Sequence, residues 1–183
     1  MTLRVEQLNV RFFTPGGVVQ AISDMTLTLG AGETLVIVGE SGCGKTVLAH
    51  ALMRLLPMNA RVDGTVRLGD TELTALSEAD MEQVRGRSIA LIPQSAATAL
   101  NPVLTIEAQL HDIAWARGVD WSTAEAELEH ILASLGLTFA DVRRKYPHQL
   151  SGGMQQRIVN AAAVLGTPAL VIADEPTYGM DPE

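Results

Sequence analysis

The chain has 183 residues, of which 47% are hydrophobic, so it can bury a core and form one compact domain with a lobed insertion. Its formal net charge is −8 and no Lys/Arg-rich stripe is visible, which argues against a nucleic-acid-binding protein. No apolar run approaches the ~18–20 residues of a membrane-spanning helix, and the single cysteine, Cys43, excludes an internal disulfide.

Two runs within residues 3–29 alternate between apolar and polar side chains. The apolar members of each run share one face of a strand: Leu8, Val10 and Phe12 in the first, and Met25, Leu27 and Leu29 in the second. A period of two predicts half-buried strands, so we expect an antiparallel sheet in this region. Residues 62–68, with Gly64 and Gly69, are expected to form a further short strand pair.

Residues 39–46 form a glycine-rich run that fits the pattern G-x-x-x-x-G-K-[ST] of a phosphate-binding loop. Residues 34–38 are predicted to form a buried strand before the loop, and residues 46–56 a helix after it, ended by Pro57. A loop between a strand and a helix points its backbone N–H groups at a phosphate. The predicted nucleotide contacts are Gly39, Glu40, Ser41, Gly42, Cys43, Gly44, Lys45 and Thr46.

Polar side chains that could act on a phosphate occur at two places. Some belong to this loop, and another follows a later predicted strand. Lys45 is expected to reach the outer phosphates, and the Thr46 hydroxyl is expected to ligate Mg²⁺. Cys43 is not expected to act as a nucleophile, because hydrolysis at this kind of loop needs none. Residues 89–93 predict a further apolar strand, which ends at Gln94.

The part of the chain between residues 96 and 157 is predicted to be a helical lobe. Two helices are expected there, at residues 106–117 and 122–135, each closed by a following glycine. Ser122 and Glu125 have the spacing of a capping box at the start of the second helix.

The lobe ends in a Leu-Ser-Gly-Gly run at the start of another predicted helix, which extends to about Leu165. Exposed N–H groups and a hydroxyl at a helix start make a second anion site. One ATP cannot touch both anion sites if they lie on opposite lobes of one subunit, so we expect a head-to-tail pair that holds each nucleotide between two subunits. The predicted nucleotide contacts here are Ser151, Gly152, Gly153 and Gln155.

Residues 169–173 form an apolar run that is typical of a fully buried parallel strand, and two acids follow it. A carboxylate at the carboxyl end of such a strand lies where open α/β sheets bind their ligands. We expect Asp174 to hold Mg²⁺ through its water shell, and Glu175 to orient or deprotonate the attacking water.

Together these motifs resemble the ATPase subunit of an ABC transporter, from about residue 3 to the last residue. The resemblance implies an α/β fold, a P-loop NTPase (RecA-like) core with an N-terminal antiparallel β subdomain and an inserted α-helical subdomain. It also implies one nucleotide-binding domain, with residues 1–95 and 158–183 as the β subdomain and nucleotide core and residues 96–157 as the helical subdomain. ATP and Mg²⁺ are the implied cofactors.

The resemblance also assigns roles to single residues. Phe12 lies at the position of the aromatic residue that stacks on adenine, with Phe13 as the alternative. Gln94 matches the Q-loop glutamine, which contacts Mg²⁺ and the membrane partner, and Asp181 matches the D-loop aspartate although the residues before it differ from the usual ones. The implied metal ligands are Thr46, Gln94 and Asp174, and the implied catalytic residues are Glu175, Lys45 and Gln94.

Residues 95–106 and 145–157 look like the oligopeptide, dipeptide and nickel importer branch of these ATPases. This resemblance implies a peripheral protein on the cytoplasmic side of the membrane, which hydrolyses ATP as a head-to-tail dimer with itself or a homologous subunit. It would power import of a small solute, of peptide or nickel type, through integral membrane permease subunits. The family docks its membrane subunit on the helical lobe, but we expect Trp115 and Trp121 of this lobe to lie in its core.

Two alternatives to an importer subunit remain open. The chain could be a soluble ABC-type ATPase with no membrane subunit, or a fragment that binds nucleotide without turnover. In the family a further strand follows the two acids and ends in a histidine that contacts the γ-phosphate. The chain stops at Glu183, so we expect a truncated chain whose own ATPase activity is open.

Overall fold

The computed structural model describes residues 1–176, so the predicted D-loop aspartate, Asp181, lies outside the described residues. The chain divides into two compact units, Met1–Gln83 and Val84–Glu183. The predicted phosphate-binding loop belongs to the first unit, whereas Gln94, the Ser-Gly-Gly run and the paired acids belong to the second.

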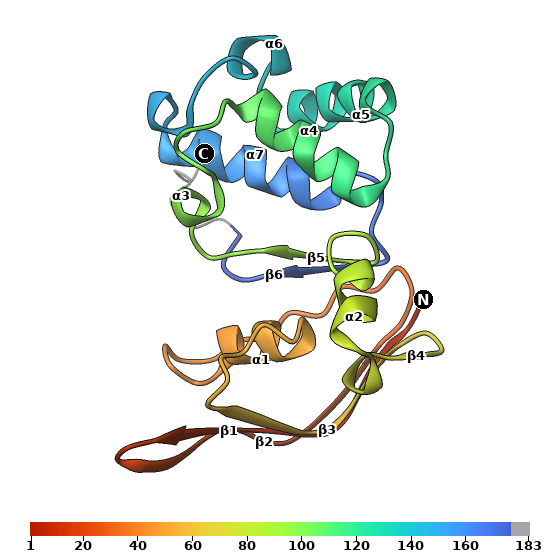
Figure 1. The fold of residues 1–183 in the computed structure, drawn as a ribbon, viewed down its shortest axis with the longest axis vertical. Helices are drawn as coiled ribbons and strands as arrows, with labels where there is room; N and C mark the ends of the chain where they lie inside the picture. The colour runs from red at the N-terminus through yellow and green to blue at the C-terminus, as the bar shows by residue number, and fades with distance from the viewer. Residues whose placement is uncertain (177–183) are drawn as a thin grey trace. The chain divides into compact units, whose positions relative to one another are not determined.

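The first unit is built on an antiparallel sheet of four strands in the order β2-β1-β3-β4 (Figure 1). The strands are β1 (Leu3–Thr14), β2 (Gly17–Leu29), β3 (Ala60–Leu68) and β4 (Thr71–Glu72). Leu8 and Val10 are fully buried on one face of β1, while Met25, Leu27 and Leu29 of β2 are each less exposed than the residues between them. The predicted antiparallel sheet is therefore confirmed, including the short strand pair after residue 60.

Helix α1 (Lys45–Leu52) follows the phosphate-binding loop and buries Leu48, Ala49, Ala51 and Leu52. It is shorter than the predicted helix of residues 46–56. The chain leaves the helix at Arg54, whose backbone is left-handed with φ of 51°. The Arg54 guanidinium donates to the backbone oxygens of Leu73 and Leu76, at 3.2 and 2.7 Å. Arg54 thereby holds the 3-10 turn η1 (Leu73–Ala75), which precedes α2 (Glu78–Val84). These hydrogen bonds contribute stability that offsets the helical hydrogen bonds lost where α1 ends early.

The predicted buried strand at residues 34–38 is wrong, because the structure gives this segment no strand. Its apolar side chains are exposed, from 42% for Ile37 to 89% for Val38. A strand needs a hydrogen-bonded neighbour, and no strand within residues 1–176 pairs with this segment. An apolar run predicts burial only where a second strand lies beside it.

The second unit contains a two-stranded parallel sheet of β5 (Ile89–Ile92) and β6 (Leu170–Ala173). Both strands were expected. The expected full burial of β6 is wrong, because intermediate and exposed residues alternate along it and Val171 is 38% exposed. The described sheet covers β6 along one edge only, with β5, whereas parallel strands are buried throughout only when both faces and both edges are covered.

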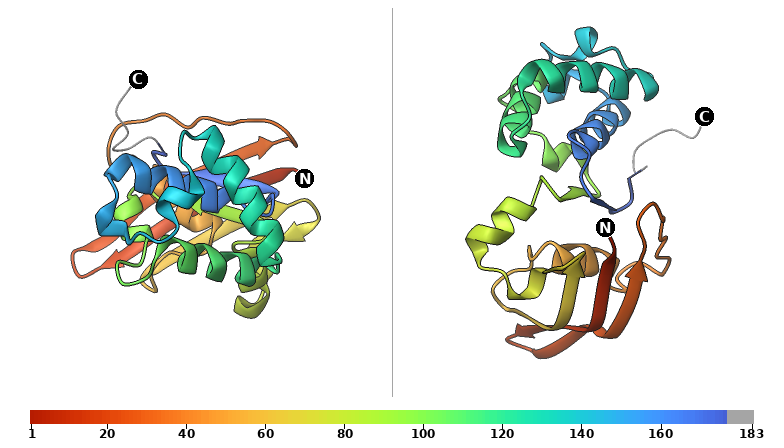
Figure 2. Two further views of the ribbon diagram at one scale, coloured as in Figure 1. Left: turned by 90° about the horizontal axis from the view of Figure 1, so that it is seen from above. Right: turned by 90° about the vertical axis from the view of Figure 1, so that its right-hand side faces the viewer.

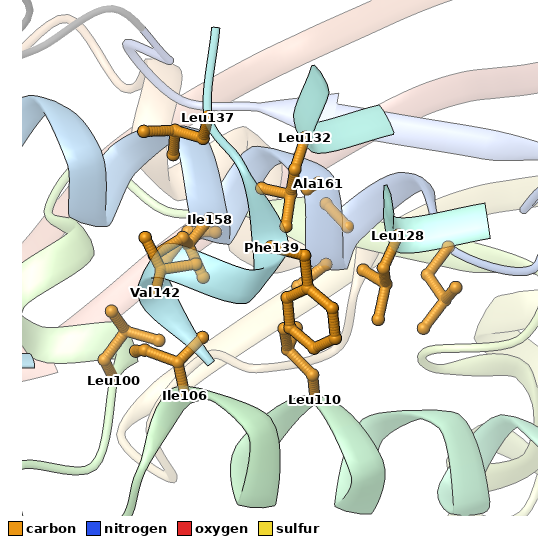
Figure 3. Packing of buried hydrophobic residues seen from close by; sticks show 14 of the residues in the cluster. Leu100, Ile106, Leu110, Leu128, Leu132, Leu137, Phe139, Val142, Ile158 and Ala161 are labelled. Carbon is orange, nitrogen blue, oxygen red and sulfur yellow. The ribbon is translucent and has the colours of Figure 1, made fainter. Parts of the chain in front are cut away.

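Helices gather on one side of this sheet (Figure 2). They are α3 (Ala96–Ala99), α4 (Ile106–Arg117), α5 (Trp121–Ser134), α6 (Phe139–Val142) and α7 (Gly152–Val164), with the 3-10 turn η2 (Pro147–Gln149) before α7. Their apolar faces form one core, in which Phe139 lies among Leu110, Leu128, Leu132 and Ala161 (Figure 3). No helix within residues 1–176 combines the length and the apolar character needed to cross a bilayer.

The ends of these helices test the predicted caps. Helix α4 has the predicted bounds, and Gly118 closes it in the left-handed conformation with φ of 73°. The predicted capping box at Ser122 is wrong, because Asp120 caps α5 by accepting from the Ser122 amide at 3.0 Å. Trp121, which we expected in the core, packs partly buried against it, but Trp115 is 79% exposed on α4.

Candidate functional site

The phosphate-binding loop in the first unit has the backbone that its glycines predict. Gly42 and Gly44 have φ of 81° and 98°, which side chains other than glycine rarely adopt. A Cβ at Gly44 would lie 2.8 Å from the Ala21 carbonyl oxygen, so the loop runs against strand β2 at this point. The Gly44 carbonyl oxygen then accepts the first helical bond of α1, from the Leu48 amide at 2.8 Å.

Lys45 folds back over this loop. Its Nζ donates to the backbone oxygens of Gly39 and Glu40, at 2.8 and 2.9 Å, and lies 3.7 Å from the Cys43 sulfur. A lysine ammonium has three donors, and here all three are directed at other residues of the loop. Thr46, the next residue, is exposed in the first turn of α1. The two side chains that were predicted to meet phosphate and Mg²⁺ therefore stand at the helix N-terminus, where anions are favoured.

The two candidate adenine-stacking residues lie on opposite faces of the sheet in the first unit. Phe12 pairs with Val19 and alternates with buried Val10 on the face where Gly44 approaches Ile22. Phe13 lies on the other face and is 50% exposed. Of the two rings, only Phe12 is on the side of the sheet against which the phosphate-binding loop packs.

In the second unit, the ends of β5 and β6 bring Gln94 and Glu175 together. The strands pair in parallel with Ile92 opposite Ala173, and the Asp174 amide donates to the Ile92 carbonyl oxygen at 2.9 Å. Beyond this bond, Gln94 Nε2 donates to Glu175 Oε2 at 2.7 Å, although the two residues are 81 positions apart. A hydrogen bond to a charged carboxylate is among the stronger ones in proteins.

Glu175 itself has a strained backbone, because its φ is 50°, in the left-handed region. Non-glycine residues hold this conformation only when their surroundings fix it, and such residues cluster at functional sites. The bond from Gln94 supplies one such restraint on the side chain.

The Ser-Gly-Gly run begins α7. Ser151 is the N-cap, and its hydroxyl oxygen accepts from the Met154 amide at 3.3 Å. Ser151 and Gly152 are exposed, so the helix start is open to solvent. Gln155 turns back instead, since its Nε2 donates to the carbonyl oxygens of Pro147 and Leu150 at 2.8 and 3.2 Å. Gln155 therefore fixes the turn that precedes the exposed helix start.

Sequence analysis did not identify one polar residue that lies near these acids. Asn160 lies on α7, and its Nδ2 donates to the carbonyl oxygen of Pro176, directly after Glu175, at 3.4 Å. The available signal was an amide inside an otherwise apolar stretch, residues 158–164. A polar side chain within an apolar helix face is informative because its burial must be compensated by hydrogen bonds.

The predicted metal ligands have the chemistry that Mg²⁺ prefers, because hydroxyl, amide and carboxylate oxygens are hard ligands. Gln94 uses its amide nitrogen toward Glu175, which leaves its amide oxygen as the ligating atom. No group of three or more His, Cys, Asp or Glu side chains that could hold a metal occurs within residues 1–176.

Residues 22–178 match the sequence profile of the family described as ABC transporter. Among curated relatives, the oligopeptide transport ATP-binding protein OppD of Haemophilus influenzae is 45% identical over 181 residues, which are 98% of this chain and 56% of the relative. The dipeptide transport ATP-binding protein DppD of Bacillus subtilis is 43% identical over 183 residues, which cover 98% of this chain and 55% of the relative. The chain thus spans about half the length of these relatives.

Solved structures show the same fold. A dimeric bacterial ABC transporter cassette aligns with a TM-score of 0.85 at 22% identity, over 98% of this chain and 76% of that one. An ATP-binding subunit of an ABC transporter aligns with a TM-score of 0.79 at 27% identity, over 100% of this chain and 69% of that one. These alignments confirm the expected P-loop NTPase fold, with its mixed α/β core and antiparallel β region.

Proposed function

Because this chain belongs to the ABC transporter family, we propose that it binds ATP with Mg²⁺ and hydrolyses it to power the import of a small solute. The observation that carries the proposal is the bond between Gln94 and Glu175 at the ends of two parallel strands. It holds a carboxylate and an amide at the sheet edge where α/β proteins bind their ligands.

The chain's own groups have distinct parts in the proposed reaction. The loop amides and Lys45 bind the phosphates and stabilise the charge that develops on the γ-phosphoryl oxygens. Thr46, Gln94 and Asp174 would hold Mg²⁺, whose charge neutralises the phosphate oxygens. Glu175 accepts a proton from the attacking water, and Gln94 orients the carboxylate that accepts it.

The nucleotide is proposed to lie between two copies of the domain, or between this chain and a homologous subunit. Ser151, Gly152 and Gly153 of one copy would contact the ATP that the other copy's phosphate-binding loop holds, and Asp181 would lie at the same interface. Support comes from the exposed start of α7 and from a solved cassette of the family that is described as dimeric. On this reading both units of the chain belong to one nucleotide-binding domain, with residues 96–157 as its helical subdomain.

A peptide is the proposed solute, because the similar proteins are named for oligopeptide and dipeptide transport. A nickel importer stays the second candidate in the same branch. The permease subunits would place this chain on the cytoplasmic side of the membrane.

A hollow in the second unit supports attachment to a permease. Its volume is about 360 Å³, and it is lined mainly by apolar side chains of β5, α4 and α7 and of the segment after Gln94, among them Leu91, Leu100, Ile113 and Val159. Exposed apolar surface of this kind is typical of a protein interface, so we assign the hollow to a cytoplasmic helix of the permease.

Phosphate release from Mg·ATP tests the proposed function, with Lys45→Ala as the matched variant. We expect turnover in the wild-type chain, and weak ATP binding in the variant because the outer phosphates lose their cation. The proposal is contradicted if the wild-type chain releases no more phosphate than Lys45→Ala. Membrane attachment is tested by co-purification with integral membrane subunits, whose absence would favour a soluble ABC-type ATPase.

A further inference from the structure

Asn160 has an unusual setting on the helix that begins with the Ser-Gly-Gly run. Its neighbours Val159 and Ala161 are buried apolar residues, as are most of the positions around it on α7. Its side chain is only partly buried, yet it is bonded at both ends within the protein. Oδ1 accepts from Gln156 Nε2 at 3.2 Å, and Nδ2 donates to the Pro176 carbonyl oxygen at 3.4 Å.

The first of these bonds fixes the direction of the amide. Gln156 is 1% exposed, so its amide has no solvent to bond and its donor is directed to Asn160. A side-chain amide that accepts through its oxygen presents its nitrogen as a donor to the opposite side. The pair therefore orients the Asn160 nitrogen toward the turn after β6.

The second bond acts on the turn that carries Glu175. Proline has no N–H, so the carbonyl oxygen is the only backbone group through which Pro176 can be held by a hydrogen bond. Three bonds then restrain the turn: the Asp174 amide to Ile92, Gln94 to the Glu175 carboxylate, and Asn160 to Pro176. The left-handed backbone of Glu175 persists only when its surroundings fix it, and these bonds are part of those surroundings.

We propose that Asn160 is a positioning residue for the Glu175 carboxylate, acting from α7 through the Pro176 carbonyl. This inference deepens the proposed function and rests on it for its effect on turnover. Gln94 holds the end of the Glu175 side chain, and Asn160 holds the backbone that follows it. Together they define where the carboxylate stands relative to the end of β6.

A merely structural role makes a different prediction. Gln156 and Asn160 are spaced i, i+4 on one helix, and such amide pairs stabilise helices by themselves. If that were the whole role of Asn160, its loss would lower the melting temperature and leave the turn and the kinetics of the remaining folded protein unchanged.

Two variants of the full chain separate these roles. Asn160→Leu has a similar volume and no polar atom, whereas Asn160→Asp still accepts from Gln156 but cannot donate to Pro176. Val164→Ala, at another partly exposed position of α7, is the matched control. We expect both Asn160 variants to lower kcat by about three- to tenfold, and the KM for Mg·ATP to stay within about twofold, because a single neutral hydrogen bond is lost and the phosphate-binding loop is untouched.

A second measurement does not depend on turnover. Amide hydrogen exchange by NMR reports local opening of the turn through the Asp174 and Glu175 amides. In Asn160→Leu we expect these two amides to exchange about three- to tenfold faster than in the wild-type chain, since one restraint on the turn is missing. Amides in the middle of α4 should not change and serve as the internal control.

The two measurements distinguish this inference from the proposed function. If the wild-type chain does not hydrolyse ATP, the proposed function fails, and the exchange rates alone decide whether Asn160 holds the turn. Unchanged exchange in Asn160→Leu overturns the inference. So does wild-type kcat in Asn160→Asp or Asn160→Leu when the wild-type chain is active.

Discussion

Gln94 Nε2 donates to Glu175 Oε2 at 2.7 Å, which joins the second residue after β5 to the second residue after β6. The two strands run in parallel, so their carboxyl ends lie at one edge of the sheet. This bond is the direct link between the Q-loop position and the proposed base. Movement of the segment after Gln94 would therefore displace the carboxylate that we propose activates water.

Replacing the proposed base tests its role. Glu175→Gln keeps the shape of the side chain but cannot accept a proton, so we expect turnover to fall by about 10²- to 10⁴-fold. ATP binding should persist, because the proposed phosphate contacts lie in the loop around Lys45. The measurement is kcat with an independent ATP titration. Glu129→Gln, at an exposed position of α5, is the control, and undiminished turnover in Glu175→Gln would remove Glu175 from the mechanism.

Loss of the Gln94 amide should affect the same step to a smaller degree. We expect Gln94→Ala to reduce kcat by about 10- to 150-fold, the range for a hydrogen bond to a charged group. Steady-state kinetics at saturating Mg·ATP measures the change, and ATP affinity at low Mg²⁺ should stay near the wild-type value. A wild-type kcat in Gln94→Ala would show that the contact with Glu175 has no part in turnover.

Phe12 and Phe13 give a matched pair for adenine stacking. Phe12 lies on the face of the sheet where the phosphate-binding loop packs, whereas Phe13 lies on the other face. We expect Phe12→Ala to weaken ATP binding by about 1–3 kcal/mol, the usual contribution of a base stacked on an aromatic ring. Phe13→Ala should bind ATP like the wild-type chain. Equal losses in the two variants would contradict the assignment to Phe12.

An ion pair in the helical lobe predicts a dependence of stability on pH. The Arg143 guanidinium donates to Glu107, with Nε at 3.1 Å from the carboxylate oxygen, and lowers the pKa of Glu107 below its ordinary value of 4.5. A lowered pKa in the folded chain contributes stability that is fully present above the ordinary pKa. This contribution is lost as the pH falls through the lower value.

Thermal unfolding of the wild-type chain and of Glu107→Gln between pH 7 and pH 3 measures this contribution. At pH 7 we expect the variant to be less stable, by on the order of 1 kcal/mol, because the pair is partly exposed. The difference should shrink once the pH is below 4.5. A difference that is the same at every pH would mean that packing rather than charge explains the effect of the substitution.

Local signals in the sequence predicted local structure. The bounds of α4 follow from an apolar period that ends at Gly118, and the bend of the phosphate-binding loop follows from Gly42 and Gly44. Features that depend on a distant partner were not predictable in this way. The exposed segment at residues 34–38 reads as a strand, yet its state depends on whether another strand lies beside it.

The candidate site shows the same distinction between residues with a local sequence signal and contacts that depend on a distant partner. Gln94 and Glu175 were each identified by motif, but the bond between them depends on the pairing of β5 with β6, which no local pattern records. The link from Asn160 to Pro176 was missed for the same reason. Trp115 was wrongly expected in the core, because helical spacing alone does not tell which face of α4 is covered.

The most direct test of the central claim is the rate of Mg·ATP hydrolysis by the wild-type chain over a range of protein concentrations, with Glu175→Gln measured in parallel. Two copies are needed to complete each proposed nucleotide site, so the specific activity should rise with concentration and exceed that of Glu175→Gln throughout. A specific activity that does not depend on concentration would contradict the head-to-tail pair, and one no higher than that of Glu175→Gln would contradict hydrolysis by this chain.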